Sequence, residues 1–128
     1  MLSQKTRAVL AALAVFAASP ALADKAEVLT PTAVPSAEAP ADAVVVTIDK
    51  MKYGPAEVTI KAGQTVTWIN AEAMPHNVAF QAGVISEAKL DGAMMKKDQS
   101  FSMTFAETGT YDYHCTPHPF MKGKVVVE

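Results

Sequence analysis

Hydrophobic residues alternate with polar ones along most of the chain after residue 43, as they do in half-buried β-strands. For example, Phe101, Met103 and Phe105 alternate with Ser102 and Thr104. The segments that carry this pattern are 43–48, 56–60, 65–70, 76–80, 100–106, 110–115 and 123–127. Short turns separate them rather than helical caps, so the pattern predicts an all-β chain folded as an antiparallel sandwich or barrel.

Two parts of the chain after residue 23 lack this alternation. Residues 24–42 are rich in Ala and Pro and predict an extended or poorly ordered N-terminal arm, in which 26–30 could pair as an edge strand. Residues 81–99 form a long gap between predicted strands, and helix is expected at most within it. We therefore predict a single domain at 43–128, preceded by the arm at 24–42.

The segment 1–23 has the pattern of a secretory signal peptide. Lys5 and Arg7 precede an apolar run from 8 to 18, and small residues follow up to a cleavage site after Ala23. The apolar run is shorter than the roughly 20 residues that a membrane-spanning helix needs, which disfavours the alternative of an N-terminal anchor. We expect cleavage, export to the periplasm and no stable membrane insertion.

The charge balance is mildly acidic. The full chain has a formal net charge of −2, and loss of Lys5 and Arg7 with the signal peptide makes the remaining chain more acidic. This balance argues against nucleic acid or anionic lipid as the main partner. The sequence also lacks nucleotide-loop, haem-attachment and zinc-protease motifs.

Cys115 is the only cysteine, so it cannot form an internal disulfide in the oxidising compartment that export implies. It is either buried as a small hydrophobic residue or bound to a ligand. It closes a predicted strand, and His118 and Met121 follow it at the spacing Cys-x-x-His-x-x-Met. Pro117 and Pro119 stiffen the intervening loop, so the three donor side chains can converge on one point.

A thiolate, an imidazole and a thioether together select a soft metal ion. Mg²⁺ and Ca²⁺ prefer oxygen ligands, and structural zinc prefers four Cys or His ligands. Two His, one Cys and a weak axial Met form a blue-copper electron-transfer site. His76, which opens the segment 76–80, is the better candidate for the second His, because His114 is adjacent to Cys115 and points to the opposite face of the sheet. The sequence therefore predicts one copper ion bound by His76, Cys115, His118 and Met121.

These residues resemble the cupredoxins, and among them the amicyanin subfamily. The similarity runs through MKYGPAEVTIKAGQTVTWINAEAMPHN and GAMMKKDQSFSMTFAETGTYDYHCTPHPFMKGKVVVE, and the short Cys-x-x-His-x-x-Met loop is its most specific part. The resemblance implies a Greek-key β-sandwich of about eight strands. It also implies a copper ion that cycles between Cu(II) and Cu(I) and carries one electron, so that the protein is not an enzyme.

The resemblance assigns supporting roles near the copper. Asn77 is expected to tie the segment of His76 to the loop of Cys115 and to donate its backbone amide toward the sulfur. Thr116 is also expected to support the copper ligands without binding the metal itself. Pro117 removes a backbone amide that could otherwise donate to the sulfur.

The resemblance also implies partners: methylamine dehydrogenase as electron donor and a soluble c-type cytochrome as acceptor, with the carrier itself a monomer. A docking surface is expected around the exposed edge of His118, because an apolar patch marks an interaction site. Its expected residues are Met51, Met74, Pro75, Met94, Pro117, Pro119 and Phe120. Lys122 would belong to a basic rim with Lys96, Lys97 and Lys124, unless these lysines are ordinary solvated side chains.

Three other functions remain open on the sequence. A pseudoazurin-like carrier would use the same copper site with another partner, such as a copper nitrite reductase or a cytochrome peroxidase. A copper-delivery protein would need a more exposed and exchangeable site. An enzyme with Cys115 as nucleophile and His118 as base would need an orienting acid and an oxyanion hole, and nothing in the sequence resembles either.

Overall fold

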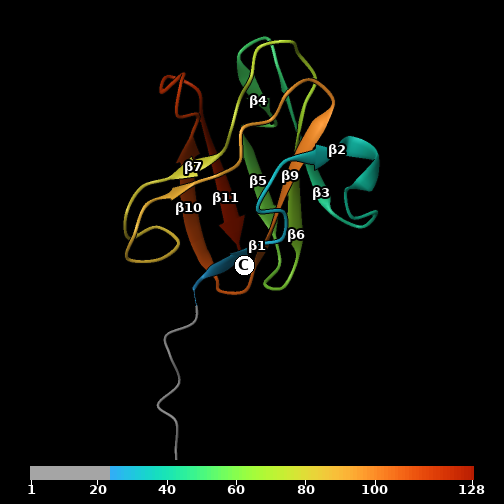
Figure 1. Cartoon of the computed structure of the whole chain (residues 1–128). Coiled ribbons are helices and arrows are strands. Elements are labelled where there is room, and N and C mark those ends of the chain that lie inside the picture. Colours follow the sequence, from blue (N-terminus) through green and yellow to red (C-terminus); the bar gives the residue numbers. More distant parts are fainter. Residues whose placement is uncertain (1–23) are drawn as a thin grey trace, which may run out of the picture.

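The computed structural model describes residues 24–128, so the predicted signal peptide at 1–23 lies outside the described residues. Two β-sheets pack against each other, which confirms the predicted all-β sandwich (Figure 1). The first sheet has the strand order β1-β9-β6-β3-β4, with β2 also paired to β9, and the second has the order β5-β11-β10-β7-β8. No helix in this described part is long and apolar enough to cross a membrane.

The strand bounds follow the hydrophobic alternation closely. In the first sheet they are β1 (Ala26–Val28), β2 (Val34–Pro35), β3 (Val44–Asp49), β4 (Lys52–Gly54), β6 (Thr65–Asn70) and β9 (Gln99–Phe105). In the second they are β5 (Glu57–Ile60), β7 (Ala79–Phe80), β8 (Leu90–Asp91), β10 (Gly109–His114) and β11 (Lys122–Val127). Six of these strands, β3, β5, β6, β9, β10 and β11, begin and end within one residue of their predicted positions.

The structure has eleven strands in residues 24–128 rather than about eight. The additional strands β2, β4 and β8 have only two or three residues each, which is too short for an alternating pattern. The predicted strand 76–80 was too long, because only Ala79 and Phe80 form a strand. His76 instead forms an isolated bridge with Met95.

Two strand pairs are parallel, so the predicted antiparallel pairing of the sandwich is wrong for these pairs. β3 runs parallel to β6, with Val46 opposite Trp68, and β5 runs parallel to β11, with Val58 opposite Val125. Alternation determines which face of a strand is buried, but it does not determine the strand's partner or direction. Between β3 and β6 the chain crosses to the second sheet as β5, and β6 then returns beside β3 in the same direction.

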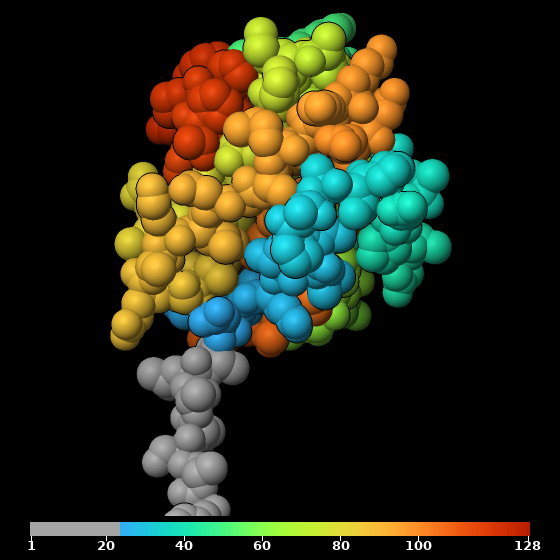
Figure 2. Space-filling view, in the orientation of Figure 1, coloured from blue at the N-terminus to red at the C-terminus, as the bar shows by residue number. Residues whose placement is uncertain are grey.

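Within residues 24–42, β1 and β2 both pair with β9 of the first sheet. Ala26 of β1 lies opposite Phe105, and Val34 of β2 lies opposite Ser100; a short 3-10 helix, η1 (Ser36–Glu38), follows. Ser100 and Ser102 are fully buried on the face of β9 away from the core residues, and their partners include Val34 O and Thr30 Oγ1. Figure 2 shows this segment, in blue and cyan, lying across the molecule. Whether 24–42 is a unit separate from 43–128 stays a prediction.

The hydrophobic core between the sheets contains a cluster of aromatic rings. The ring of Tyr113 lies 4.8 Å from that of Tyr53, 5.3 Å from that of Trp68 and 5.8 Å from that of Phe80, measured between centroids. All four side chains are buried. Tyr113 lies on β10, which ends one residue before Cys115, so this cluster supports the end of the strand that leads into the cysteine.

Four connections meet at one end of the sandwich, the upper end in Figures 1 and 2. They are the turn between β3 and β4, the segment 71–78, the segment 92–98 and the loop 115–121. His76, Cys115 and His118 all come from these connections or from their junctions with strands. The candidate metal centre therefore lies at this end.

Candidate metal centre

His76 is fixed by its backbone as well as by its side chain. Its N–H donates to Met95 O over 3.2 Å, and its carbonyl accepts from Met95 N over 2.8 Å. Met95 is fully buried, and so is His76. The preceding Pro75 limits the conformation of the chain at this point. His76 is thus held by a neighbouring segment rather than by a regular strand.

The loop from Cys115 to Met121 closes on itself through three backbone hydrogen bonds. His118 N donates to Cys115 O (3.3 Å), Met121 N donates to His118 O (2.9 Å), and Cys115 N donates to Met121 O (3.2 Å). Pro117 and Pro119 lie within this loop and restrict its φ angles. The loop is therefore a tight, hydrogen-bonded turn, and its stiffness stays a prediction.

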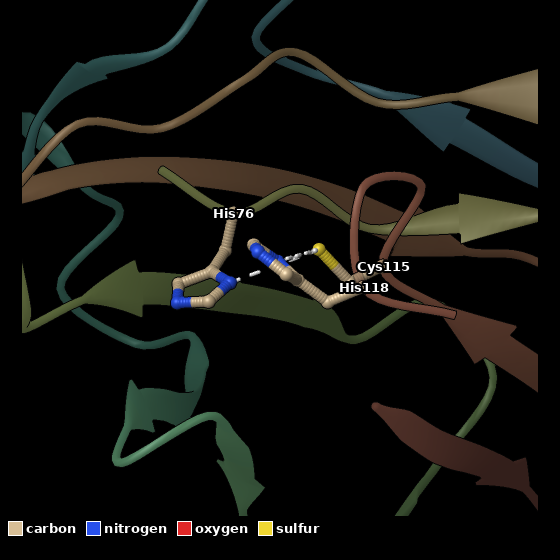
Figure 3. Close-up of side chains that lie close together, drawn as sticks. All are labelled: His76, Cys115 and His118. Atoms are coloured by element: carbon tan, nitrogen blue, oxygen red, sulfur yellow. Dashed lines mark hydrogen bonds between the residues drawn. The ribbon is translucent and has the colours of Figure 1, made fainter. Parts of the chain in front are cut away.

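The three strong donor atoms converge beneath this loop (Figure 3). Cys115 Sγ lies 3.7 Å from His76 Nδ1 and 3.5 Å from His118 Nδ1, and all three donor atoms lie within 4.8 Å of one another. Metal–sulfur and metal–nitrogen bonds of about 2.3 and 2.0–2.1 Å at tetrahedral to trigonal angles place the two donors roughly 3.6–3.8 Å apart. The two sulfur–nitrogen separations therefore fit a single shared ion.

The composition of the donor set fits copper. One sulfur and two imidazole nitrogens suit a Cu(II)/Cu(I) ion better than the hard ions that oxygen ligands bind. Cys115 is fully buried and His118 is partly exposed, so one edge of the site reaches the surface. Met121 is also buried, and its backbone closes the loop; its thioether as an axial ligand stays a prediction.

His114 lies apart from this group. The cluster of potential metal ligands within residues 24–128 contains His76, Cys115 and His118, and it does not include His114. His114 pairs with Lys122 and Ala79 on β10, where its side chain alternates with those of Tyr113 and Cys115. This placement agrees with the parity argument made from the sequence.

Asn77 connects the two halves of the site. Its Nδ2 donates to Thr116 Oγ1 (2.9 Å) and to Gly92 O (3.2 Å), and its Oδ1 accepts from Thr116 N (2.8 Å). The segment after His76 and the loop after Cys115 are therefore tied by a two-way amide contact. The expected contact between the Asn77 backbone amide and the sulfur stays a prediction.

We expect Asn77→Ala to destabilise the metal-free protein by about 2 kcal/mol, because Thr116 N and the partly buried Gly92 O lose their partner. Urea unfolding of the metal-free chain measures this loss. Gln81→Ala, which removes an exposed amide, is the matched control and should change stability little. Equal stability of the two variants would contradict the bridging role of Asn77.

Three further residues support the site and were missed from the sequence. Glu72 Oε1 is 2.5 Å from His76 Nε2, the ring nitrogen that faces away from the cysteine. Tyr53 OH donates to Asn77 O over 2.6 Å. Asn70 is fully buried, and its Nδ2 donates to Met74 O and Met95 O, each over 2.9 Å. No short motif links these residues to the cysteine loop, so only the fold brings them to it.

The environments of two supporting residues shift their pKa values. Burial, together with the nearby Cys115 and Tyr113, raises the pKa of Tyr53 far above its ordinary value, so its hydroxyl remains a donor. Partial burial raises the pKa of Glu72, but hydrogen bonds from His76 and from the Met51 and Lys50 amides outweigh it and lower that pKa overall. Glu72 is therefore a carboxylate at neutral pH.

The predicted docking residues lie on or beside the connections at the end of the sandwich that carries His118, and they differ in exposure. Among the five large hydrophobic side chains exposed in the described chain, Met74, Met94 and Phe120 belong to the connections at this end of the sandwich. Pro75, Pro117, Pro119 and Lys122 are exposed, whereas Met51 is only partly so. The ring of Phe120 lies 6.2 Å from that of His118, measured between centroids. Exposed apolar side chains thus occur at this end of the sandwich, and their role as a docking surface stays a prediction.

Comparisons with known proteins agree with this geometry. A family model described as copper binding proteins of the plastocyanin/azurin family matches residues 40–128. Amicyanin of Paracoccus denitrificans is 61% identical over 126 residues, covering 97% of this chain and 96% of that protein. Amicyanin of Paracoccus versutus is 58% identical over 132 residues, covering 100% of both chains. A solved structure of a reduced amicyanin variant has a TM-score of 0.81 and 61% identity, covering 82% of this chain and 100% of that one.

Proposed function

Because the chain belongs to the plastocyanin/azurin family of copper-binding proteins, we propose that it is a periplasmic electron carrier of the amicyanin type. It is a copper protein and a carrier rather than an enzyme. In this proposal it accepts single electrons from methylamine dehydrogenase and passes them to a c-type cytochrome. The proposed copper ligands are His76, Cys115, His118 and Met121.

The observation that carries the proposal is the buried cysteine sulfur with two imidazole Nδ1 atoms 3.5 and 3.7 Å away. Bound copper supplies a one-electron couple at this position. The residues of the chain hold the donors in place: the bridge with Met95 fixes His76, and the backbone bonds of the 115–121 loop fix Cys115 and His118. A site that is already organised in the protein needs little rearrangement when an electron arrives.

The surface around His118 supports the entry of electrons at this edge. His118 is the partly exposed member of the donor group, and Met74, Met94 and Phe120 expose apolar side chains on the connections at this end. An apolar contact of modest size suits the short-lived encounters of redox partners. Donor identity rests on the resemblance to the amicyanins.

The test is the visible absorbance of copper-loaded protein during mixing with substrate-reduced methylamine dehydrogenase. Rapid bleaching of a blue band is the expected result, because the dehydrogenase reduces Cu(II) to Cu(I). A blue band that persists would retain the copper centre and overturn the proposed donor. Absence of a blue band in the copper-loaded protein would overturn the proposed site itself.

The same experiment tests the docking surface through a pair of truncations. Phe120 is 68% exposed beside His118, whereas Leu29, which is 42% exposed, follows β1 and donates its N–H to Ser102 O in the middle of β9. We expect Phe120→Ala to slow the second-order bleaching about tenfold without changing the blue band, because an aromatic anchor at an interface contributes more than 1 kcal/mol. Leu29→Ala should react like the unchanged protein. Equal rates for both variants would contradict docking at this surface.

A further inference from the structure

The carboxylate of Glu72 is surrounded by donors from two separate segments. Oε1 contacts His76 Nε2 at 2.5 Å and accepts from Met51 N over 3.1 Å. Oε2 accepts from Lys50 N over 2.9 Å, an amide that also lies 3.0 Å from Asp49 Oδ1. The two backbone amides can only donate, so the carboxylate is an acceptor throughout.

This arrangement determines the protonation pattern of the His76 ring. A neutral imidazole has one N–H and one free nitrogen lone pair, and a carboxylate beside Nε2 favours the form with the proton on Nε2. The lone pair then lies on Nδ1, the nitrogen that faces Cys115 Sγ at 3.7 Å. Glu72 thus prepares the nitrogen that a metal ion between His76 and Cys115 requires.

The same carboxylate holds an unusual turn. Lys50 and Met51 connect β3 to β4 with φ angles of 52° and 59°, although neither residue is glycine. Two-residue turns with both φ angles positive strongly prefer Asn-Gly or Asp-Gly, because other side chains are strained there. Glu72 accepts from the amides of both turn residues, so it stabilises a conformation that their side chains disfavour.

Glu72 is itself held in position. Its N–H donates to Asn70 Oδ1 over 3.1 Å, and Asn70 is fully buried at the end of β6. The Asn70 Nδ2 contacts with Met74 O and Met95 O fix the rest of this segment. The carboxylate is therefore presented from a rigid support between the turn and the histidine.

We propose that Glu72 is a positioning residue that holds His76 with Nδ1 free for copper. It also links this ligand to the Lys50–Met51 turn, at the end of the sandwich where the four connections meet. The inference rests on the proposed copper site. A carboxylate that accepts from a ligand imidazole also makes the imidazole a stronger donor, which stabilises Cu(II) relative to Cu(I). Glu72 therefore lowers the reduction potential as well as orienting the ring.

The first test uses the metal-free protein and needs no activity. Nitrogen-15 NMR of the His76 ring distinguishes the two neutral forms, and we expect the Nε2–H form in the unchanged protein. In Glu72→Gln, which preserves size but places an amide group among three donors, we expect a mixture of the two forms. A ring protonated on Nδ1 in the unchanged protein would overturn the proposal, whether or not the protein binds copper.

The second test measures the reduction potential of copper-loaded protein. We expect Glu72→Gln to lower the affinity for Cu(II) relative to Cu(I) about tenfold, which raises the potential by about 59 mV for one electron. Glu87→Gln, which removes the same charge at an exposed position in the 81–89 connection, should leave the potential unchanged. Equal potentials in the two variants would overturn the proposal while leaving the copper site and the carrier function intact.

A double variant separates ligand positioning from turn stability. Lys50→Gly relieves the strain at φ 52°, so Glu72→Gln with Lys50→Gly should unfold at a higher urea concentration than Glu72→Gln alone. The raised potential should persist in the double variant, because His76 still lacks the carboxylate. Return of the potential to its original value would show that Glu72 acts only through the fold, and would overturn its role toward His76.

Discussion

Replacing Cys115 by serine is expected to abolish the intense blue absorption of the copper-loaded protein. This absorption requires a thiolate bound to Cu(II), and Cys115 is the only cysteine in the chain that could supply one. The serine oxygen is a harder and weaker donor between the two imidazoles. We expect Cu(II) affinity to fall by more than the roughly 10- to 100-fold that follows loss of a residue that only supports a ligand. Absorbance and copper titration measure both effects.

His114→Ala is the matched control for this prediction. His114 is the last residue of β10 and immediately precedes Cys115, but it lies outside the group of converging donors. The control should retain the blue band, and circular dichroism should show the same β-sheet content in both variants. A blue band that survives Cys115→Ser would mean that Cys115 is only a buried packing residue, the other interpretation that the sequence leaves open.

The sequence predicts the fold well where a strand is long enough to alternate. Phe101, Met103 and Phe105 bury one face of β9, and the predicted and observed strands differ by one residue. The same pattern cannot predict β4, which has three residues and follows a turn without glycine or asparagine. The amides of that turn donate to Glu72, which is distant in sequence. Contacts between segments distant in sequence therefore determine short elements such as β4, which the local hydrophobic pattern cannot predict.

The residues of the site also fall into two groups: those that local sequence spacing predicts and those that only the fold brings together. The spacing of Cys115, His118 and Met121 is local, so the sequence predicts the loop and its donors directly. His76 was a prediction by elimination among the histidines, and the structure brings its Nδ1 within 3.7 Å of the sulfur. Glu72 and Tyr53 carry no such signal, because their roles depend on which side chains β3, β4 and the 71–78 segment bring together.

The close contact between Gly123 and Tyr113 leads to the second large effect. The two residues lie directly opposite each other on β11 and β10. A methyl group added at Gly123 would overlap the Tyr113 ring, with Cε2 only 2.5 Å away. The ring cannot move aside easily, because Tyr53, Trp68 and Phe80 pack around it. Glycine is therefore required here so that the aromatic cluster can lie over the strand beneath the cysteine.

We expect Gly123→Ala to destabilise the metal-free protein by about 3 kcal/mol, because a close-packed core cannot accept the extra methyl group without displacing Tyr113. This corresponds to a fall in melting temperature of at least about 12 °C. Calorimetry of the metal-free chain measures it, with Gly54→Ala as control, since a methyl group there meets only Thr47 O at 3.6 Å. If the two variants melt together, the Tyr113 ring is free to move and does not brace the end of β10. If Gly123→Ala melts far lower, the packing of the Tyr113 ring, two residues before Cys115, stabilises the end of β10 that leads into the copper ligands.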